Sequence, residues 1–204
     1  MATLYTPLVD GQPRRADTYN APLAEMETAI LARAGTMVTR QPWTTMSVGD
    51  TKIVLDVVAG DNMLQLMMTL RTNRAGASDD AIRITINDDV ANTYASRYAL
   101  VDGSVASAGN SATTGFQLDY AATAATATAG TYSYVMVRIP MASVASARAM
   151  HYDSAMQPSV GGTMRLCVGS GFYPGTAIVT RLRIVPVNGT NFVAGCRYAL
   201  YGMA

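Results

Sequence analysis

The sequence predicts a mainly β protein, an antiparallel jelly-roll-like β-sandwich preceded by an extended N-terminal arm and one short α-helix. Three observations predict it. One helix-like apolar stripe lies near the start of the chain, short β-branched and aromatic runs follow from residue 36 onward, and clusters of Gly, Asn, Asp and Ser separate these runs. The 204 residues suffice for one sandwich with a small appendage. We therefore divide the chain into residues 1–35, the arm and helix, and residues 36–204, the sandwich.

The arm and the helix make up the first of these parts. Residues 1–15 contain prolines and glycine but no apolar core of their own, which predicts an extended segment. The helix follows, with Asn20 as its N-cap, Pro22 in its first turn and Gly35 as its stop. A helix of roughly four turns is marginal alone and must bury its apolar stripe. We expect burial on the β-domain or, as we favour, on symmetry mates around a three-fold axis, through Leu23, Met26, Ile30 and Leu31.

Eleven strands are predicted after the helix. The run 82–86, Ile-Arg-Ile-Thr-Ile, alternates cleanly and ends in a turn. The Ala- and Thr-rich stretch 121–130 is interpreted as a long surface loop. Strands at such turn-rich spacing favour a sandwich over a parallel α/β sheet, with the final strand inserted between others. The predicted strands are residues 36–40, 43–48, 52–58, 64–71, 82–86, 94–101, 115–120, 132–139, 164–168, 177–187 and 196–203.

The charge of the chain is low and balanced. Charged residues make up 14% of the sequence, against a usual share of about a quarter, and the net charge is +1. A thin charged coat is typical of a surface that neighbours cover, which favours a subunit of an assembly. No basic run indicates nucleic-acid binding. No stretch approaches the ~20 apolar residues of a membrane span, and the N-terminus lacks the pattern of a signal peptide, so we expect synthesis in the cytoplasm.

Side chains for catalysis are scarce. His151 is the only histidine and lacks a neighbouring nucleophile motif, so we interpret it as structural. The only two glutamates, Glu25 and Glu27, lie on the predicted helix, which argues against the paired carboxylates of glycoside hydrolysis. Cys167 and Cys196 are interpreted as reduced, buried thiols. One His and two distant Cys make no zinc site. We therefore expect no enzyme activity and no cofactor.

Three Asp-rich stretches leave calcium as an alternative to that expectation. They are Asp61-Asn62, Asp79-Asp80 and Asp88-Asp89, and none fits the EF-hand loop. Asp and Asn also favour turns through bonds to their own backbone. We interpret all three as turns and predict no metal site. The Gly169-Ser170-Gly171 stretch is placed between strands, not before a helix, so it does not predict a phosphate site.

Three stretches of the chain carry a resemblance to a known class of proteins. Residues 17–30 include Asn20-Ala-Pro-Leu at the start of the helix, and residues 70–94 include Ile-Thr-Ile-Asn-Asp-Asp. Residues 177–202 end in Phe-Val-Ala-Gly-Cys-Arg-Tyr-Ala-Leu-Tyr-Gly, close to a recurrent ending "Phe-x-x-Gly-Ser-x-Phe-x-Leu-Tyr-Gly". Cys196 and Tyr198 depart from the Ser and Phe of that ending. In these stretches the chain resembles tailed-bacteriophage virion structural proteins of the fibre and decoration type.

The resemblance implies a non-enzymatic, homotrimeric or otherwise multimeric subunit on the virion surface. Its implied partners are its own copies and other virion proteins, namely capsid, portal or tail subunits. We favour a fibre- or spike-type appendage that is anchored by residues 1–35, displays the sandwich outward and contacts a host surface receptor. Four tyrosines are candidates for that contact, although for each one a half-buried strand position is the alternative: Tyr120, Tyr132, Tyr152 and Tyr173.

Two other functions stay open from the sequence. A capsid decoration (cement) protein, which stabilises the head lattice, fits the high Ala and Thr content and the low charge. A secreted carbohydrate-binding module fits the fold class. It fits less well otherwise, because a signal peptide is not recognisable and Trp43 is the only tryptophan for sugar stacking.

Overall fold

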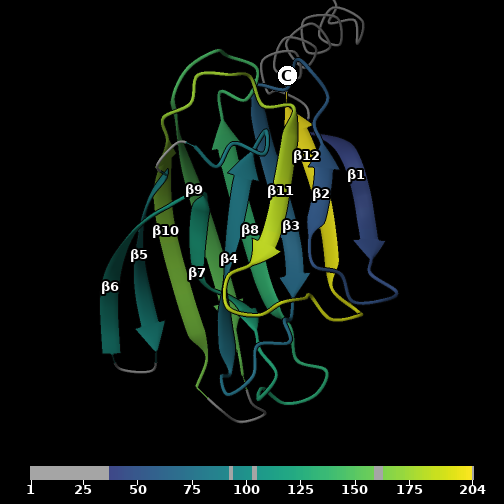
Figure 1. Cartoon of the computed structure of the whole chain (residues 1–204), viewed down its shortest axis with the longest axis vertical. Helices are drawn as coiled ribbons and strands as arrows, with labels where there is room; N and C mark the ends of the chain where they lie inside the picture. Colours follow the sequence, from purple (N-terminus) through teal and green to yellow (C-terminus); the bar gives the residue numbers. More distant parts are fainter. Residues whose placement is uncertain (1–36, 92–93, 103–104, 159–162, 204) are drawn as a thin grey trace, which may run out of the picture. The chain divides into compact units, whose positions relative to one another are not determined.

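The computed structural model describes residues 37–91, 94–102, 105–158 and 163–203 (Figure 1). In these ranges the chain forms twelve strands in two antiparallel sheets, and no helix. Consequently no described helix has the length and apolar character of a membrane span. The mainly β prediction is confirmed. The predicted arm, the helix, the division at residue 35 and the stripe lie outside the described residues, so they stay predictions: Leu23, Met26, Ile30 and Leu31.

The two sheets differ in size, and all paired strands are antiparallel. The final strand, β12, lies between β1 and β3, as predicted. The larger sheet has the spatial order β1 (Val38–Thr45), β12 (Arg197–Met203), β3 (Met63–Leu70), β8 (Ser133–Pro140), β9 (Arg148–Met156), β10 (Arg165–Tyr173), β5 (Tyr94–Asp102) and β6 (Val105–Thr113). The smaller sheet has the order β2 (Ile53–Asp56), β11 (Arg181–Pro186), β4 (Asp79–Ile86) and β7 (Phe116–Thr123).

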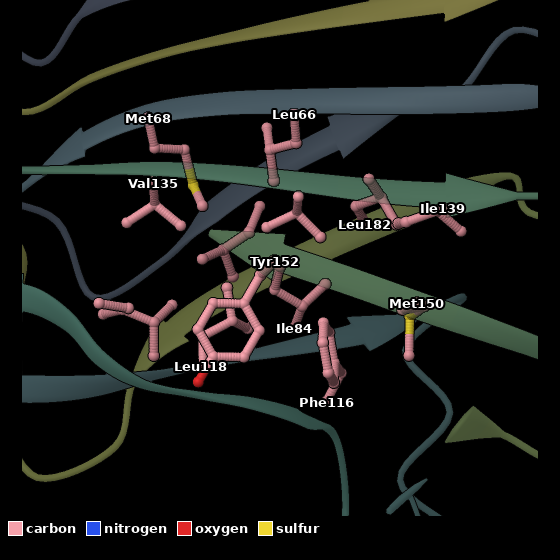
Figure 2. Close-up of a cluster of buried hydrophobic side chains, with 14 of the residues drawn as sticks. Leu66, Met68, Ile84, Phe116, Leu118, Val135, Ile139, Met150, Tyr152 and Leu182 are labelled. Carbon is pink, nitrogen blue, oxygen red and sulfur yellow. The ribbon is translucent and has the colours of Figure 1, made fainter. Parts of the chain in front are cut away.

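Alternation along the strands builds one hydrophobic core between the two sheets. In β3 every second side chain from Leu64 to Leu70 is buried, because successive residues of a strand point to opposite faces. Figure 2 shows Leu66 and Met68 of this strand near the apolar side chains of the smaller sheet. Ile84 of β4 and Leu182 of β11 belong to the same buried cluster. The sheets are therefore held together by a shared apolar layer.

Glycines on the inner face of β10 make room for two aromatic rings. A Cβ atom on Gly169 would lie 2.1 Å from Cε1 of Tyr152, and one on Gly171 would lie 2.3 Å from Cε2 of Phe116. The Tyr152 and Phe116 rings pack edge to face, with centroids 5.7 Å apart. The placement of Gly169-Ser170-Gly171 between strands is therefore wrong, because these residues continue β10 and leave the space that the rings fill.

Two buried charged side chains fasten the loops at opposite ends of the strands. Arg148, at the start of β9, donates hydrogen bonds to the carbonyl oxygens of Val144, Ser146 and Ala177. Asp80, near the start of β4, accepts hydrogen bonds from residues in two other connections. Both groups are buried and their hydrogen bonds go to loop residues. They therefore stabilise the conformation of these loops and are not available to a ligand.

The predicted surface loop at residues 121–130 is wrong for its first part. Residues 121–123 complete β7 and are buried, because their small side chains let the backbone lie close to β3 and β8. The loop proper begins after them and is held by Arg71. The Arg71 guanidinium donates to the carbonyl oxygens of Ala127 (2.9 Å), Thr128 (2.7 Å) and Thr131 (3.1 Å). An arginine bonded in this way fixes the loop from within.

Several strand boundaries also differ from the prediction. Residues 36–40 and 43–48 were predicted as two strands, but a single strand, β1, runs through both with two register shifts against β12. Pro42 lies in this strand at a sheet edge, where its missing N–H costs no ladder bond. The strands β6 and β9 were not predicted. β6 consists mostly of Ala, Ser, Gly and Asn, and β9 has no β-branched residue and one aromatic residue, so neither carries the β-branched and aromatic pattern on which strand prediction depends.

Candidate functional site

The outward face of the eight-stranded sheet carries the candidate site. Residues that lie directly opposite each other on paired strands point to the same face of a sheet, so their side chains form rows across it. We use the name polar row for one of them, defined by the pairing of β5, β10, β9, β8, β3 and β12. In that strand order it consists of Arg97, Ser170, His151, Arg138, Gln65 and Tyr201.

Apolar and small residues flank the polar row. On β10 the neighbouring outward residues Val168 and Phe172 are 50% and 46% exposed. Val101 of β5 pairs with Leu166 of β10, and both are also exposed. Tyr134 of β8 adds an exposed ring to the same face. Large apolar side chains that gather on one exposed sheet face typically mark an interaction surface.

A shallow depression lies at one end of the polar row. It has a volume of about 240 Å³, and the polar side chains that line it are Arg97, Ser170 and His151. These three residues come from three adjacent strands, in direct register. Val168 and Ala99 supply part of the apolar wall. The arrangement combines hydrogen-bond donors with a small apolar surface, the usual composition of a ligand site.

The charges of the row are mainly positive. Asp153, on β9, is the acidic residue beside it, and its carboxylate lies 3.3 Å from His151 Nε2 and 3.7 Å from Arg138 Nη1. The Arg97 side chain makes no hydrogen bond or ion pair with any other described residue. The row therefore holds two permanent cations and an imidazole, and the one carboxylate beside it contacts only Arg138 and His151 of the three. The local field favours an anionic ligand.

Two of the four tyrosines that the sequence predicts as receptor contacts are buried. Tyr152 and Tyr173 are fully buried, because both point to the inner face of their strands, so their prediction as receptor contacts is wrong. Burial raises the pKa of Tyr152 and raises that of Tyr173 to about 12. Tyr120 packs edge-on against Tyr98, and the half-buried Tyr132 donates a hydrogen bond to the carbonyl oxygen of Ala194.

Internal bonds occupy the residues that were candidates for other chemistry. Cys167 and Cys196 are free and buried, as predicted, and burial raises the pKa of both thiols. Asp79 and Asp80 belong to β4, so their interpretation as a turn is wrong. The described residues contain no group of three or more His, Cys, Asp or Glu side chains placed to hold a metal ion. Each carboxylate that was weighed for calcium binding is contacted by a donor side chain of the protein itself, as Asp61 is by Arg40.

Sequence reasoning did not bring the residues of the polar row together, although it weighed His151 for catalysis and Ser170 for a phosphate site and set both aside. A signal was present in the strand 132–139, where buried Val135, Val137 and Ile139 leave Tyr134 and Arg138 facing outward. The same alternation places Arg97 outward on β5. Ser170 could not be found in this way, because the predicted strand ended before it.

Comparison with known proteins adds no assignment. The chain matches no protein-family model, no curated protein and no solved structure. Its function is therefore inferred from its own fold and surface.

Proposed function

We propose that the chain is a non-enzymatic structural subunit of a bacteriophage virion, a fibre- or spike-type appendage anchored by residues 1–35 with its β-domain displayed outward. The observation that carries this proposal is the strand order of the two sheets, which fits a jelly-roll sandwich. Jelly rolls are common in virus particles, so the fold is compatible with the resemblance of three stretches of the sequence to virion proteins.

The jelly-roll interpretation follows from eight of the twelve strands. The order β1-β12-β3-β8 stands against β2-β11-β4-β7 in the other sheet. Consecutive strands such as β1 and β2, β3 and β4, or β11 and β12 lie in different sheets. This alternation between four strands of the larger sheet and the four strands of the smaller sheet is the pattern of paired Greek keys. The other four strands, β9, β10, β5 and β6, extend the larger sheet beyond β8.

The surface supports a role in binding a partner. The exposed apolar side chains of β5 and β10 lie side by side, through the pairs Val101 with Leu166 and Ala99 with Val168. A soluble monomer seldom keeps such a surface uncovered. Since this face also carries polar and cationic groups, we place the contact with the host on it rather than on the tyrosines predicted from the sequence.

A capsid decoration protein is the second candidate, and one observation favours it. Exposed apolar residues also gather at the end of the β-domain where β1 begins. Backbone hydrogen bonds join the loops there, from Val179 N to the carbonyl oxygen of Ala142 and from Ala142 N to that of Asn62. Such an end could seat on a capsid lattice. The residues are Val38, Val58, Met141, Val144 and Ile178.

Particle composition and mass in solution test the proposal together. Antibodies against the β-domain should label appendages of purified virions in electron micrographs. Absence of the chain from purified virions would overturn the proposal. Light scattering should give a trimer for the full chain and a monomer for the fragment 36–204. A monomeric full chain, with label spread over the head, would favour the decoration protein instead.

A further inference from the structure

We propose that the polar row is a binding site for a carboxylated glycan, with one acidic sugar unit seated in the depression at Arg97, Ser170 and His151. The inference deepens the proposed function, since it names the ligand class of the outward face, and it rests on that function for its biological setting. Its chemistry rests on the geometry of the sheet alone.

Arg97 supplies the first argument. A guanidinium carries five N–H donors in a planar fork that matches a carboxylate, and a bidentate pair is stronger than a neutral hydrogen bond. Several other arginines of the described chain have such partners, as in Arg40 with Asp61 and Arg165 with Asp79. Arg97 instead lines an open depression without a bonded partner among the described residues. An exogenous carboxylate would complete its bonding.

The two neighbours of Arg97 add directed hydrogen-bonding groups. Ser170 lies opposite Arg97 on one side and opposite His151 on the other. Since paired strands are about 4.8 Å apart, the three groups lie within about 10 Å. The contact between His151 Nε2 and Asp153 orients the imidazole and leaves its other ring nitrogen available. The site can therefore bind a carboxylate and adjacent hydroxyl groups together.

The size of the depression limits what it can hold. Its volume of about 240 Å³ is below the range of about 300–1,000 Å³ for pockets that enclose drug-sized ligands. One sugar unit suits this space. The row then continues across the sheet through Arg138, Gln65 and Tyr201, which offer a second cation, an amide and a phenol. Further units of a linear chain could bind along these groups.

Two other occupants fit the face less well. A peptide commonly adds to a sheet through free backbone groups at an edge, but β5, β10 and β9 are each paired on both sides. A second copy of the chain, placed symmetrically on this face, would bring the cations of one row opposite the cations of the other. Like charges across an interface are costly. An acidic glycan avoids both problems.

Calorimetry on the full-length chain tests the inference. The probes are trigalacturonate and an α2,8-linked sialic acid trimer, two oligomers of carboxylated sugars, with the methyl ester of trigalacturonate as the uncharged counterpart. At least one of the two acidic oligomers should bind. If trigalacturonate binds, its methyl ester should bind at least tenfold more weakly. Arg97→Gln should weaken binding about tenfold or more, which corresponds to about 1.4 kcal/mol.

The control variant is Arg183→Gln, an exposed arginine on the outward face of the smaller sheet. It should bind like the natural chain. Failure of both acids to bind, or equal binding by Arg97→Gln, would overturn the inference. A hexaglutamate peptide that binds as tightly as either acid would replace the glycan by an acidic protein. These outcomes leave the virion proposal intact, because particle composition tests that separately.

Discussion

The variant Asp80→Asn removes one acceptor atom from a buried network without changing its shape. Asp80 Oδ1 accepts hydrogen bonds from the backbone N (3.1 Å) and the Nδ2 (3.0 Å) of Asn188. Its Oδ2 accepts bonds from the Thr72 hydroxyl (2.9 Å) and the backbone N of Gly189 (2.8 Å). Because Asn188 and Gly189 lie between β11 and β12, these bonds fasten that connection to the start of β4.

The cost follows from the donors that the amide cannot satisfy. The Asn side chain is expected to place its NH₂ group beside Thr72, whose hydroxyl can turn and accept. Gly189 N then faces a donor and stays unpaired. An unpaired donor costs about 1–3 kcal/mol when it is buried, and Gly189 is partly buried. The remaining bonds also lose the strength that the negative charge gives them. We expect the free energy of unfolding to fall by about 3 kcal/mol.

Urea unfolding followed by circular dichroism measures this change. With a slope of about 2 kcal/mol per molar urea, the midpoint should fall by about 1.5 M. The control is Asp88→Asn, since Asp88 is exposed, has a positive φ that Asn tolerates, and pairs with Arg181 and Arg183 at the surface. Its midpoint should change by less than about 0.5 M. Equal shifts for the two variants would refute the argument from buried bonding.

Three further predictions follow from buried groups. Gly202→Ala should lower stability by about 2 kcal/mol, seen as a lower Tm, because its Cβ would lie 2.1 Å from the buried carboxylate of Asp61; an unchanged Tm would contradict this. Arg71→Met should release the loop 124–131 and speed its cleavage by elastase, whereas an unchanged rate would show that the loop is held otherwise. Stability should also fall as pH rises through the alkaline range. Burial raises the folded-state pKa of five fully buried Cys and Tyr side chains, so their contribution is fully present below the ordinary values of about 8.5 for Cys and about 10 for Tyr and is lost above them. A Tm that stays constant from pH 8 to 12 would contradict this for Tyr94, Tyr152, Tyr173, Cys167 and Cys196.

Strands that carry their own apolar alternation were predicted well. The runs 64–71, 94–101 and 132–139 match β3, β5 and β8 to within a residue. In each of them the core-facing side chains are mostly large, so the period of two is visible locally. β6, Val-Ala-Ser-Ala-Gly-Asn-Ser-Ala-Thr, has no such pattern. It is a strand because β5 pairs with it along its whole length, which is a tertiary cause.

The candidate site was beyond prediction for the same reason. Arg97, Ser170 and His151 come together because β10 lies between β5 and β9, and the order of strands in a sheet has no local signature. Tyr152 and Tyr173 were expected on the outer face of the sheet, but their side chains point to the inner face. An aromatic residue on a strand can point either way, and here the glycines beside the two rings supply inner space. A Cβ on Gly175 would lie 2.2 Å from the Tyr173 ring.

The strands β9, β10, β5 and β6, which extend the larger sheet beyond β8, tolerate substitutions differently on their inner and outer faces, and this gives a last prediction. On the inner face of β10, Gly169 must stay small beneath the Tyr152 ring, so Gly169→Ala should cost about 1–3 kcal/mol. On the outer face, Arg97 and Ser170 are exposed and contribute little packing, so Arg97→Gln and Ser170→Ala should change stability by no more than about 0.5 kcal/mol. If these two variants lost glycan binding while keeping their Tm, the outer face would be a binding surface carried on an independently stable sheet. If they lowered Tm as Gly169→Ala does, the polar row would instead be part of what holds the sheet together.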